Sequence, residues 1–445
     1  MFGLRAGFAG GIRLPVTERS DGDGLIRQLA FAPLLRLPLR QHAGAASVAV
    51  VRAGDEVQRG QLLARAEDDS AVPLHAPATG RVVRITEQAD AETGTVREIE
   101  LAPLPGDTQE EVLKPALVAE RCRPDELLLA IREAGIVGQG GEAGPTHLRL
   151  ARARERGVRV LVINGIEGEP GFCRVPALLA RHARDLLSGL RCLLRVLETD
   201  QAVLAVESPD GEAAGAMLDS AVDGPCPTLR ILPPRYPQGA AELLLRRLAA
   251  DSRGFSAAEA VVFSLGTVAE IGRLLGGGRV VTDQLLTLAG DGLREPGNYR
   301  VPLGTPVGFA LARAGAEAEL DRVLLGGLMR GRSLAGLERP ITKATTGLVA
   351  VSARSAARLP QPTSCIRCGE CVAACPVQLH PAELGLLARR GEVEAMVDEW
   401  HLERCFECGC CSYVCPSHIP LVQMFRAAKL QHRRARQLAT AEAAA

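Results

Sequence analysis

The chain has 445 residues, which is too long for one hydrophobic core and indicates about three or four domains. An apolar fraction of 47% is ordinary for a globular protein, and a formal net charge of zero gives no indication of a nucleic-acid partner. No apolar stretch reaches the roughly 18 residues that a membrane span needs, and the N-terminal residues lack the apolar run of a signal peptide, so we expect neither feature.

The first part of the chain is predicted to be rich in β-structure. Residues 1–30 form an irregular N-terminal segment. Residues 31–108 then alternate short runs of β-forming residues with turn signals such as Gly54-Asp55 and Gly80. A Pro-containing linker over about 104–114 closes this unit.

The period of the apolar pattern changes in residues 115–275, where strands and helices are expected to alternate. Residues 124–136 form an amphipathic helix that ends at Gly135, and 158–167 form a buried strand. One long helix is predicted over 177–198, followed by a strand over 201–208 and a helix over 240–250. This alternation predicts a mainly parallel α/β sheet.

Three further units complete the chain. Residues 276–350 again resemble β-structure, and the linker LPQPTS separates them from a cysteine-rich domain over 360–432. Residues 433–445 are expected to be a frayed tail. The fold class is therefore multidomain α+β.

The cysteine-rich domain contains an internal repeat. Nine of the 13 cysteines lie between Cys365 and Cys415, which favours metal binding in a reducing compartment over disulfides. CIRCGECVAACP and CFECGCCSYVCP both match C-x2-C-x2-C-x3-C-P, forty residues apart. This spacing is typical of 4Fe–4S clusters, whereas zinc, the alternative, usually takes paired C-x2-C knuckles.

The fourth cysteine of each such run ligates the other cluster in two-cluster folds. The helix-like sequence between the two runs favours a helical dicluster domain over a compact bacterial ferredoxin. Cys410 is an extra thiol with no ligand role assigned. One cluster is thus expected on Cys365, Cys368, Cys371 and Cys415, and the other on Cys405, Cys408, Cys411 and Cys375.

Two loops of the α/β region are candidates for cofactor binding. The N–H groups of Gly138, Gly140 and Gly141 could face a phosphate, although a loop of this kind is often only a connection. NGIEGEPG follows the buried strand, and ligands bind at strand ends in α/β sheets. Its polar residues, which could hydrogen-bond a ribityl chain, a ribose or an amide, are Asn164, Glu167 and Glu169.

Several motifs in order along nearly the whole chain resemble one family. GxGGxxxPTH, INGxExEP, YPQGA (236–240), GDGLREPGNYRVPLGTP (290–306) and the two cysteine runs resemble the RnfC component of the Rnf (Rsx) electron-transport complex. GGIRLP, LPLRQHAGA and PLHAPATG near the N-terminus are also similar to that family. The middle part resembles the flavin-bearing, NADH-oxidising subunit of respiratory complex I.

The resemblance implies four domains: a lipoyl-like barrel-sandwich domain, an α/β domain for FMN and NADH, a β-grasp SLBB module and a dicluster ferredoxin domain. It implies an NADH-linked oxidoreductase subunit, peripheral on the cytoplasmic face of the cell membrane. The expected partners are the other subunits of an ion-translocating complex and a ferredoxin-type redox protein. Tyr236 of YPQGA is expected to stack on, or hydrogen-bond to, the flavin or the nicotinamide, and Glu169 to hold NADH.

The chain departs from the family in its pocket segments. Glu142 adds a carboxylate to the glycine loop, where a phosphate would be disfavoured, and Ser264 replaces the usual Asn before a Gly-Thr turn. The alternative function is therefore a non-catalytic iron–sulfur electron-transfer or docking subunit with a degenerate flavin site.

Overall fold

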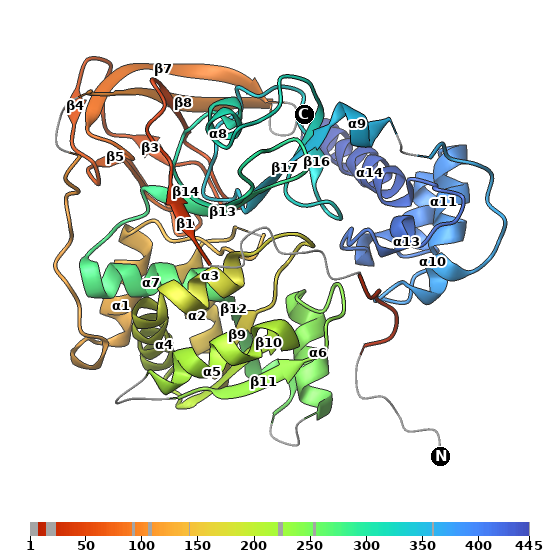
Figure 1. The fold of residues 1–445 in the computed structure, drawn as a ribbon, viewed down its shortest axis with the longest axis horizontal. Helices are drawn as coiled ribbons and strands as arrows, with labels where there is room; N and C mark the ends of the chain where they lie inside the picture. Colours follow the sequence, from red (N-terminus) through yellow and green to blue (C-terminus); the bar gives the residue numbers. More distant parts are fainter. Residues whose placement is uncertain are drawn as a thin grey trace.

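The computed structural model describes residues 8–14, 24–90, 94–105, 109–141, 143–220, 226–251, 255–357 and 360–444. Figure 1 shows a β-rich unit and an α/β unit stacked on one another, with a helical unit beside them.

The β-rich unit consists of two small sheets that share one core. The four-stranded sheet has the order β2-β8-β7-β4 and the three-stranded sheet the order β3-β5-β6. Inward-facing residues such as Leu37, Leu63 and Ile99 are fully buried in the common core. The strands are β2 (Leu35–Pro38), β3 (Val48–Ala49), β4 (Glu56–Val57), β5 (Leu62–Arg65), β6 (Leu74–His75), β7 (Gly80–Asp90) and β8 (Gly94–Pro103).

The α/β unit contains a parallel four-stranded sheet with the order β11-β10-β9-β12. Alternate residues of β9 enter two different cores: Leu161 and Ile163 pack with α1, α4 and α7, whereas Val160 and Val162 pack with α6. This alternation follows from the two-residue period of a strand and explains the continuous apolar run that predicted a buried strand. The strands are β9 (Val160–Gly165), β10 (Gln201–Glu207), β11 (Thr228–Leu232) and β12 (Ala260–Ser264), and the helices are α1 (Pro124–Glu133), α2 (Thr146–Glu155), α3 (Arg174–Arg181), α4 (Ala183–Leu197), α5 (Gly211–Asp219), α6 (Ala241–Asp251) and α7 (Leu265–Gly277).

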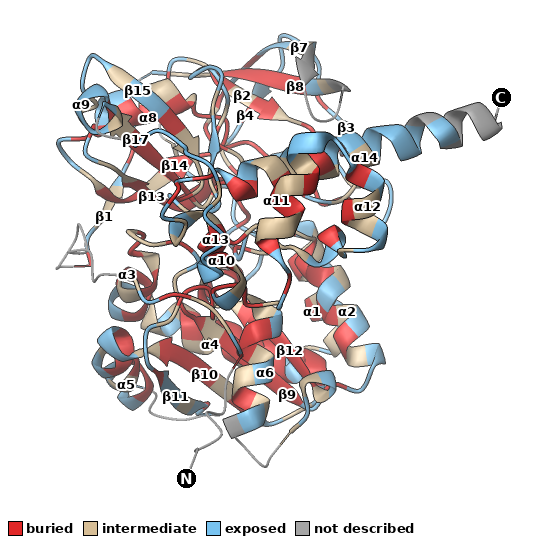
Figure 2. Ribbon diagram, turned by 90° about the vertical axis from the view of Figure 1, so that its right-hand side faces the viewer, coloured by how far each residue is buried: buried red, intermediate tan, exposed pale blue. Residues whose placement is uncertain are grey.

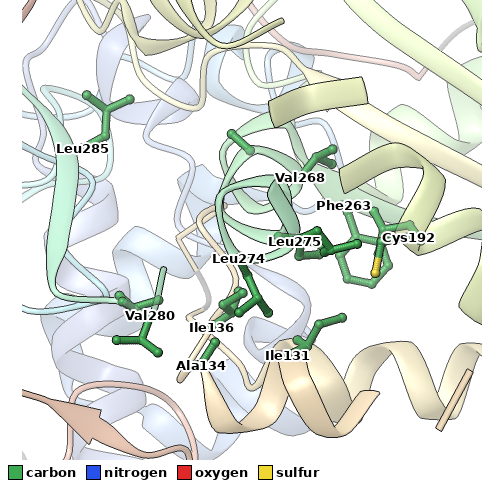
Figure 3. Close-up of a cluster of buried hydrophobic side chains, with 14 of the residues drawn as sticks. Ile131, Ala134, Ile136, Cys192, Phe263, Val268, Leu274, Leu275, Val280 and Leu285 are labelled. Carbon is green, nitrogen blue, oxygen red and sulfur yellow. The ribbon is translucent and has the colours of Figure 1, made fainter. Parts of the chain in front are cut away.

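Helix α7 is held tightly in the larger core. In Figure 3, Leu274 and Leu275 lie among Ile131, Ile136 and other apolar side chains. Burial of each such side chain contributes roughly 1.5–3 kcal/mol. Helices α4 and α7 approach closely because Gly189 and Gly272 lack side chains: a Cβ on Gly272 would lie 1.8 Å from the Asp185 carbonyl oxygen.

The prediction of one helix over 177–198 is wrong. The structure has two helices, α3 and α4, because His182 leaves the helical conformation with φ −122° and ψ 26°. Its ring Nδ1 lies 2.8 Å from the Asp185 carboxylate in the first turn of α4. This local side-chain contact gives the chain an alternative to continued helix at His182.

A six-stranded mixed sheet with the order β1-β14-β13-β17-β15-β16 forms the third unit. Its first strand, β1 (Ile26–Gln28), pairs in parallel with β14, so the prediction that residues 1–30 are irregular is wrong for this part. Such a pairing depends on a strand far along the chain, which local sequence does not encode. The other elements are β13 (Asp283–Ala289), β14 (Gly297–Pro302), β15 (Leu320–Leu325), β16 (Arg332–Ser333), β17 (Gly347–Ser352), α8 (Val307–Arg313) and α9 (Ala353–Ala356).

The regular elements of the cysteine-rich unit are helices, as far as this unit is described. The sequence repeat recurs in the backbone, since Gly369 and Gly409 both have positive φ, at 81° and 83°. The predicted frayed tail is wrong for its described part, because α14 continues to Ala444 through Ala-rich sequence without Gly or Pro. Figure 2 shows the coloured C-terminal turns of α14 extending away from the other helices of this unit. The helices are α10 (Glu370–Ala373), α11 (Pro381–Arg390), α12 (Val393–Asp398), α13 (Cys410–Tyr413) and α14 (Leu421–Ala444).

Candidate functional site

A cavity of about 1360 Å³ opens at the carboxyl ends of the parallel strands. Asn164, Glu207 and Ser264, at the ends of β9, β10 and β12, all line it. The volume exceeds the range of roughly 300–1,000 Å³ that is usual for one small ligand. Of the predicted cofactor-binding residues the cavity brings together Gly138, Gly140, Asn164, Glu167, Glu169 and Tyr236.

The glycine loop lies beside the start of α7. The N–H of Gln139 donates to Thr267 Oγ1 at 2.9 Å, and Ser264 caps α7 by accepting from the Thr267 N–H at 3.3 Å. Gly141, the one predicted residue absent from the cavity wall, has φ +100° with nothing within 4 Å of a Cβ built on it. Glu142 lies outside the described residues.

The wall beside the glycine loop is suited to an anion. The first turns of the 13-residue α7 and the 10-residue α2 both contribute to the cavity wall, and helix N-termini carry partial positive charge. Arg149 and Arg152 of α2 also line the cavity and add full positive charges. The prediction that the Gly138 N–H faces a phosphate is wrong, because this N–H donates to the Gly144 carbonyl oxygen at 2.9 Å. Gly140 is then the predicted loop donor that lines the cavity, and together with the two helix starts it fits the phosphate of a flavin mononucleotide.

The polar residues of the acidic loop contact the protein backbone. Asn164 Nδ2 donates to the Gly239 carbonyl oxygen at 2.8 Å, and its Oδ1 accepts from the Ile166 N–H at 3.1 Å. Glu167 Oε1 accepts from the Val175 N–H at 2.6 Å, in the first turn of α3. These contacts shape the cavity wall, and direct contact of these side chains with a ligand stays a prediction.

Glu169 connects the α/β unit to the third unit. Its two carboxylate oxygens accept from the N–H groups of Met329 and Arg330, each at 3.0 Å, and a Cβ on Gly327 would lie 2.4 Å from Glu169. Burial raises the pKa of Glu169 to about 7, against the opposing effect of these N–H donors. Both oxygens are therefore engaged at this junction, so the prediction that Glu169 holds NADH has gained no support from its geometry.

Tyr236 lies between the cavity and the cysteine-rich unit. The residue lines the cavity, and its hydroxyl donates to the carbonyl oxygen of Cys408 at 2.7 Å. Burial raises the pKa of the Tyr236 phenol above its usual range. We expected this hydroxyl near a flavin or nicotinamide, whereas the structure directs it to a predicted cluster ligand.

Sequence reasoning missed three parts of the wall. Arg330 comes from the third unit, Phe406 from the second cysteine run, and Leu14 from the N-terminal strap, which we define as residues 8–14. The Gly10-Gly11 pair in the strap was a signal for close backbone packing, because a Cβ on Gly10 would lie 2.5 Å from the Cys375 carbonyl oxygen.

The first predicted ligand set surrounds a small cavity of its own. Cys365, Cys368, Cys371 and Cys415 all line it, so the fourth cysteine of the second run meets the three of the first. Cys368 is exposed, and Ile366 between the ligands is 68% exposed. This donor set fits a 4Fe–4S cluster, which takes one thiolate at each iron.

The second predicted set is more deeply buried. Burial raises the pKa of the Cys411 thiol, and the neighbouring thiols Cys408, Cys405 and Cys375 raise it further. Cys375, of the first run, thus lies with three cysteines of the second. The described residues include no group of three His, Cys, Asp or Glu side chains placed to hold a single metal ion.

Cys410 is fully buried beside the second set. Its thiol hydrogen-bonds to Cys408, which lowers the pKa of Cys408 and raises that of Cys410.

Three family models match the chain. The RnfC barrel sandwich hybrid domain matches residues 6–103, the Nuo51 FMN-binding domain 131–271, and the 4Fe–4S dicluster domain 364–419. These matches agree with the predicted barrel-sandwich, flavin-type and dicluster domains.

Curated relatives and a solved structure extend the likeness. The C subunit of the ion-translocating oxidoreductase complex of Rhodobacter capsulatus is 32% identical over 430 residues, covering 94% of this chain and 82% of that protein. Its counterpart in Pasteurella multocida is 33% identical over 429 residues, 95% of this chain but only 51% of that protein. An NAD+-reducing [NiFe]-hydrogenase in its H2-reduced state shares the fold over 70% of this chain and 62% of its own, with a TM-score of 0.50 and 20% identity. The chain thus belongs to the RnfC family, the C subunits of ion-translocating oxidoreductase complexes.

Proposed function

We propose that this chain takes electrons from NADH through FMN and passes them through two 4Fe–4S clusters to other subunits of an ion-translocating membrane complex. The observation that carries this proposal is the composition of one cavity wall. Gly140, whose N–H suits a flavin phosphate, shares that wall with Phe406, which lies between two predicted cluster ligands. A two-electron donor and one-electron acceptors would therefore meet at one place.

NADH would lose a hydride and become NAD+, with release of one proton. The two cysteine sets would hold two clusters that can each accept one of the two electrons. FMN, when bound, supplies the exchange between hydride transfer and single-electron transfer. The chain's own residues would hold the phosphate with the glycine loop and the starts of α2 and α7, and bring the ferredoxin domain against the cavity through Tyr236.

The assembly and location follow the same proposal. The chain would be a peripheral subunit on the cytoplasmic face of the cell membrane, delivering electrons toward a ferredoxin-type partner. None of the helices in the described residues has the length and apolarity needed to cross a membrane. We also assign residues 276–350 to a β-grasp module of the SLBB type, supported by the packing of α8 against a mixed sheet.

The two cysteine sets are proposed as the crossed cluster ligands. Iron and sulfide analysis of anaerobically reconstituted protein should give about eight of each per chain. Replacing Cys375 by Ser should perturb the cluster of the second run, and replacing Cys415 the cluster of the first. An effect confined to the cluster of the same run would contradict the crossing.

FMN titration of the full chain, followed by flavin fluorescence, tests the flavin site. Gly140→Asp should weaken binding at least about tenfold, because a second negative charge about 4 Å from the phosphate costs on the order of 4 kcal/mol at an intermediate effective dielectric. Gly215→Asp is the matched control, since it adds the same carboxylate in α5 where nothing lies within 4 Å.

The second candidate function is a docking and electron-wiring subunit without flavin. It is favoured by the engagement of Asn164 and Glu169 with backbone groups. Absence of FMN binding by the wild type would support it, and recovery of binding in Glu142→Ala would mean that this carboxylate has closed the site.

A further inference from the structure

Arginines from different units line the large cavity. Arg149 and Arg152 come from α2, beside the glycine loop. Arg330 comes from the 327–331 loop of the third unit, and Arg404 from a short helical turn of the cysteine-rich unit. A flavin mononucleotide has one phosphate, and the cavity of about 1360 Å³ exceeds the usual volume for one small ligand. The second pair of arginines therefore suits another anionic ligand.

The backbone around Arg330 is fixed by two neighbouring units. The Arg330 N–H donates to the carboxylate of Glu169 in the α/β unit at 3.0 Å. Arg426 of α14 donates to the Arg330 carbonyl oxygen at 2.8 Å. A Cβ on Gly409, just before α13, would lie 2.7 Å from the Met329 carbonyl oxygen, so the loop also packs closely against the second cysteine run. These contacts fix the point on the cavity wall from which the Arg330 side chain extends.

The guanidinium groups of Arg330 and Arg404 have no protein partner within the described part of the chain. Both residues are exposed, and neither side chain makes a hydrogen bond or an ion pair with another described residue. Arg235 of the same wall differs, because its guanidinium donates to the Gly10 carbonyl oxygen and lies 5.0 Å from the centre of the Phe8 ring. Arg330 and Arg404 can thus donate to a ligand without first breaking a contact inside the protein.

The carboxylates among the described residues of this wall already have partners in the chain. Each of them accepts from a backbone or side-chain donor: Glu167, Glu169, Glu207 and Glu242. Burial also raises the pKa of Glu169 to about 7, so this group loses part of its negative charge near neutral pH. Repulsion of an incoming anion by these groups is therefore reduced, whereas the positive charges of Arg330 and Arg404 are not neutralised by an ion pair with a described residue.

We propose that Arg330 and Arg404 form a diphosphate subsite for the dinucleotide substrate, apart from the residues that would hold the flavin phosphate. This inference rests on the proposed function and adds to it the residues that position NADH. A guanidinium presents several N–H donors in one plane, which suits the paired oxygens of a phosphate. Because the two arginines belong to the third unit and the cysteine-rich unit, the subsite is complete only when both units pack against the α/β unit.

Isothermal titration calorimetry of the anaerobically reconstituted full chain with ADP-ribose tests the subsite. ADP-ribose has the diphosphate of NADH but no nicotinamide, so binding is measured without a redox step. Arg330→Gln and Arg404→Gln should each weaken binding at least about tenfold, because each removes hydrogen bonds between charged groups. Arg330→Lys keeps the charge and should weaken binding less. Circular dichroism of each variant shows that the fold is retained.

Arg339→Gln is the matched control. Arg339 is an exposed arginine of the same unit as Arg330, it does not line the cavity, and its side chain pairs with no other described residue. Its substitution should change the affinity for ADP-ribose by less than about twofold. Wild-type affinity in both Arg330→Gln and Arg404→Gln, or no binding of ADP-ribose by the wild type, would overturn the subsite.

Inorganic pyrophosphate distinguishes a dinucleotide subsite from a simple anion site. It has the diphosphate alone, so it should displace ADP-ribose only at a concentration at least about tenfold higher than ADP-ribose itself requires. Displacement at equal concentration would overturn the assignment to a dinucleotide.

Failure of the proposed function can be told apart from failure of this inference, because FMN titration of the wild type tests the flavin site separately. If the wild type takes no FMN but binds ADP-ribose through Arg330 and Arg404, the proposed function fails and the subsite stands. If the wild type takes FMN and neither substitution affects ADP-ribose, the subsite fails and the flavin site stands.

Discussion

Replacing Asp283 by Asn should loosen the junction of the three N-terminal units. Asp283 begins β13 and is 2% exposed. Its Oδ1 lies 3.1 Å from an Arg273 nitrogen of α7 and 2.7 Å from an Arg300 nitrogen of β14, and its Oδ2 lies 3.3 Å from an Arg59 nitrogen of the barrel-sandwich unit. One carboxylate thus pairs with guanidinium groups from three units.

The free-energy cost of Asp283→Asn follows from the burial of these charges. Removing one partner of a buried ion pair costs about 3–5 kcal/mol, because the remaining charge is left without compensation. Glu270 also contacts Arg273 at 3.1 Å and Arg300 at 3.6 Å, so we expect the lower end, about 3 kcal/mol. That free energy corresponds to roughly a hundredfold change in an opening equilibrium.

Native-state hydrogen exchange is the assay, since a chain of several domains does not unfold in two states. Amides of β13, β14 and α7 should lose roughly a hundredfold protection. Asp125→Asn is the control: Asp125 pairs with Arg154 at 2.7 Å but its side chain is 82% exposed, and such pairs contribute about 0–1 kcal/mol. Protection in Asp283→Asn within threefold of the wild type would refute the reasoning.

The pH dependence gives a second check on the same residue. Burial alone would raise the pKa of Asp283, but Arg273 and Arg300 hold it well below its usual range. A lowered carboxyl pKa contributes stability above the unfolded pKa of about 3.9, which is lost as the pH falls toward the folded value. The difference between wild type and Asp283→Asn should therefore persist down to about pH 4 and shrink only below it.

Three further predictions concern other junctions. Burial lowers the pKa of Lys343 to about 7, and its ammonium donates to the Pro73 and Gly135 carbonyl oxygens. The unfolded chain therefore binds more protons than the folded chain between about pH 7 and 10, so the free energy of unfolding of the wild type, relative to Lys343→Met, should rise over this range. Chemical denaturation at a series of pH values measures this difference. The raised pKa of Glu169 has the opposite consequence. Relative to Glu169→Gln, the free energy of unfolding of the wild type should fall by roughly 3 kcal/mol between about pH 4.5 and 7. A difference between the two proteins that does not change with pH would contradict this. Gly10→Ala should detach the strap and make it sensitive to limited proteolysis, because the new Cβ would lie 2.5 Å from a carbonyl oxygen; unchanged cleavage would show that the strap accommodates it.

The local features of the site could be read from the sequence. The two cysteine runs predicted both ligand sets, and the repeat recurs as matching left-handed backbone at Gly369 and Gly409. The glycine loop was predicted to follow a helix and the NGIEGEPG loop to follow a strand, and both loops line the cavity. These features are local because cysteine spacing, glycine conformation and apolar period act over a few residues.

Contacts between distant segments were decided only by the tertiary structure. The pairing of β1 with β14, the strap against Cys375 and the bond from Tyr236 to Cys408 each join residues far apart in sequence. The carboxylate of Glu169 was predicted to face a ligand, whereas packing of the 327–331 loop placed two backbone N–H groups against it. A buried polar group without a hydrogen-bond partner costs about 1–3 kcal/mol, so a polar side chain pairs with whichever group packing brings within reach. Sequence spacing alone does not specify that partner.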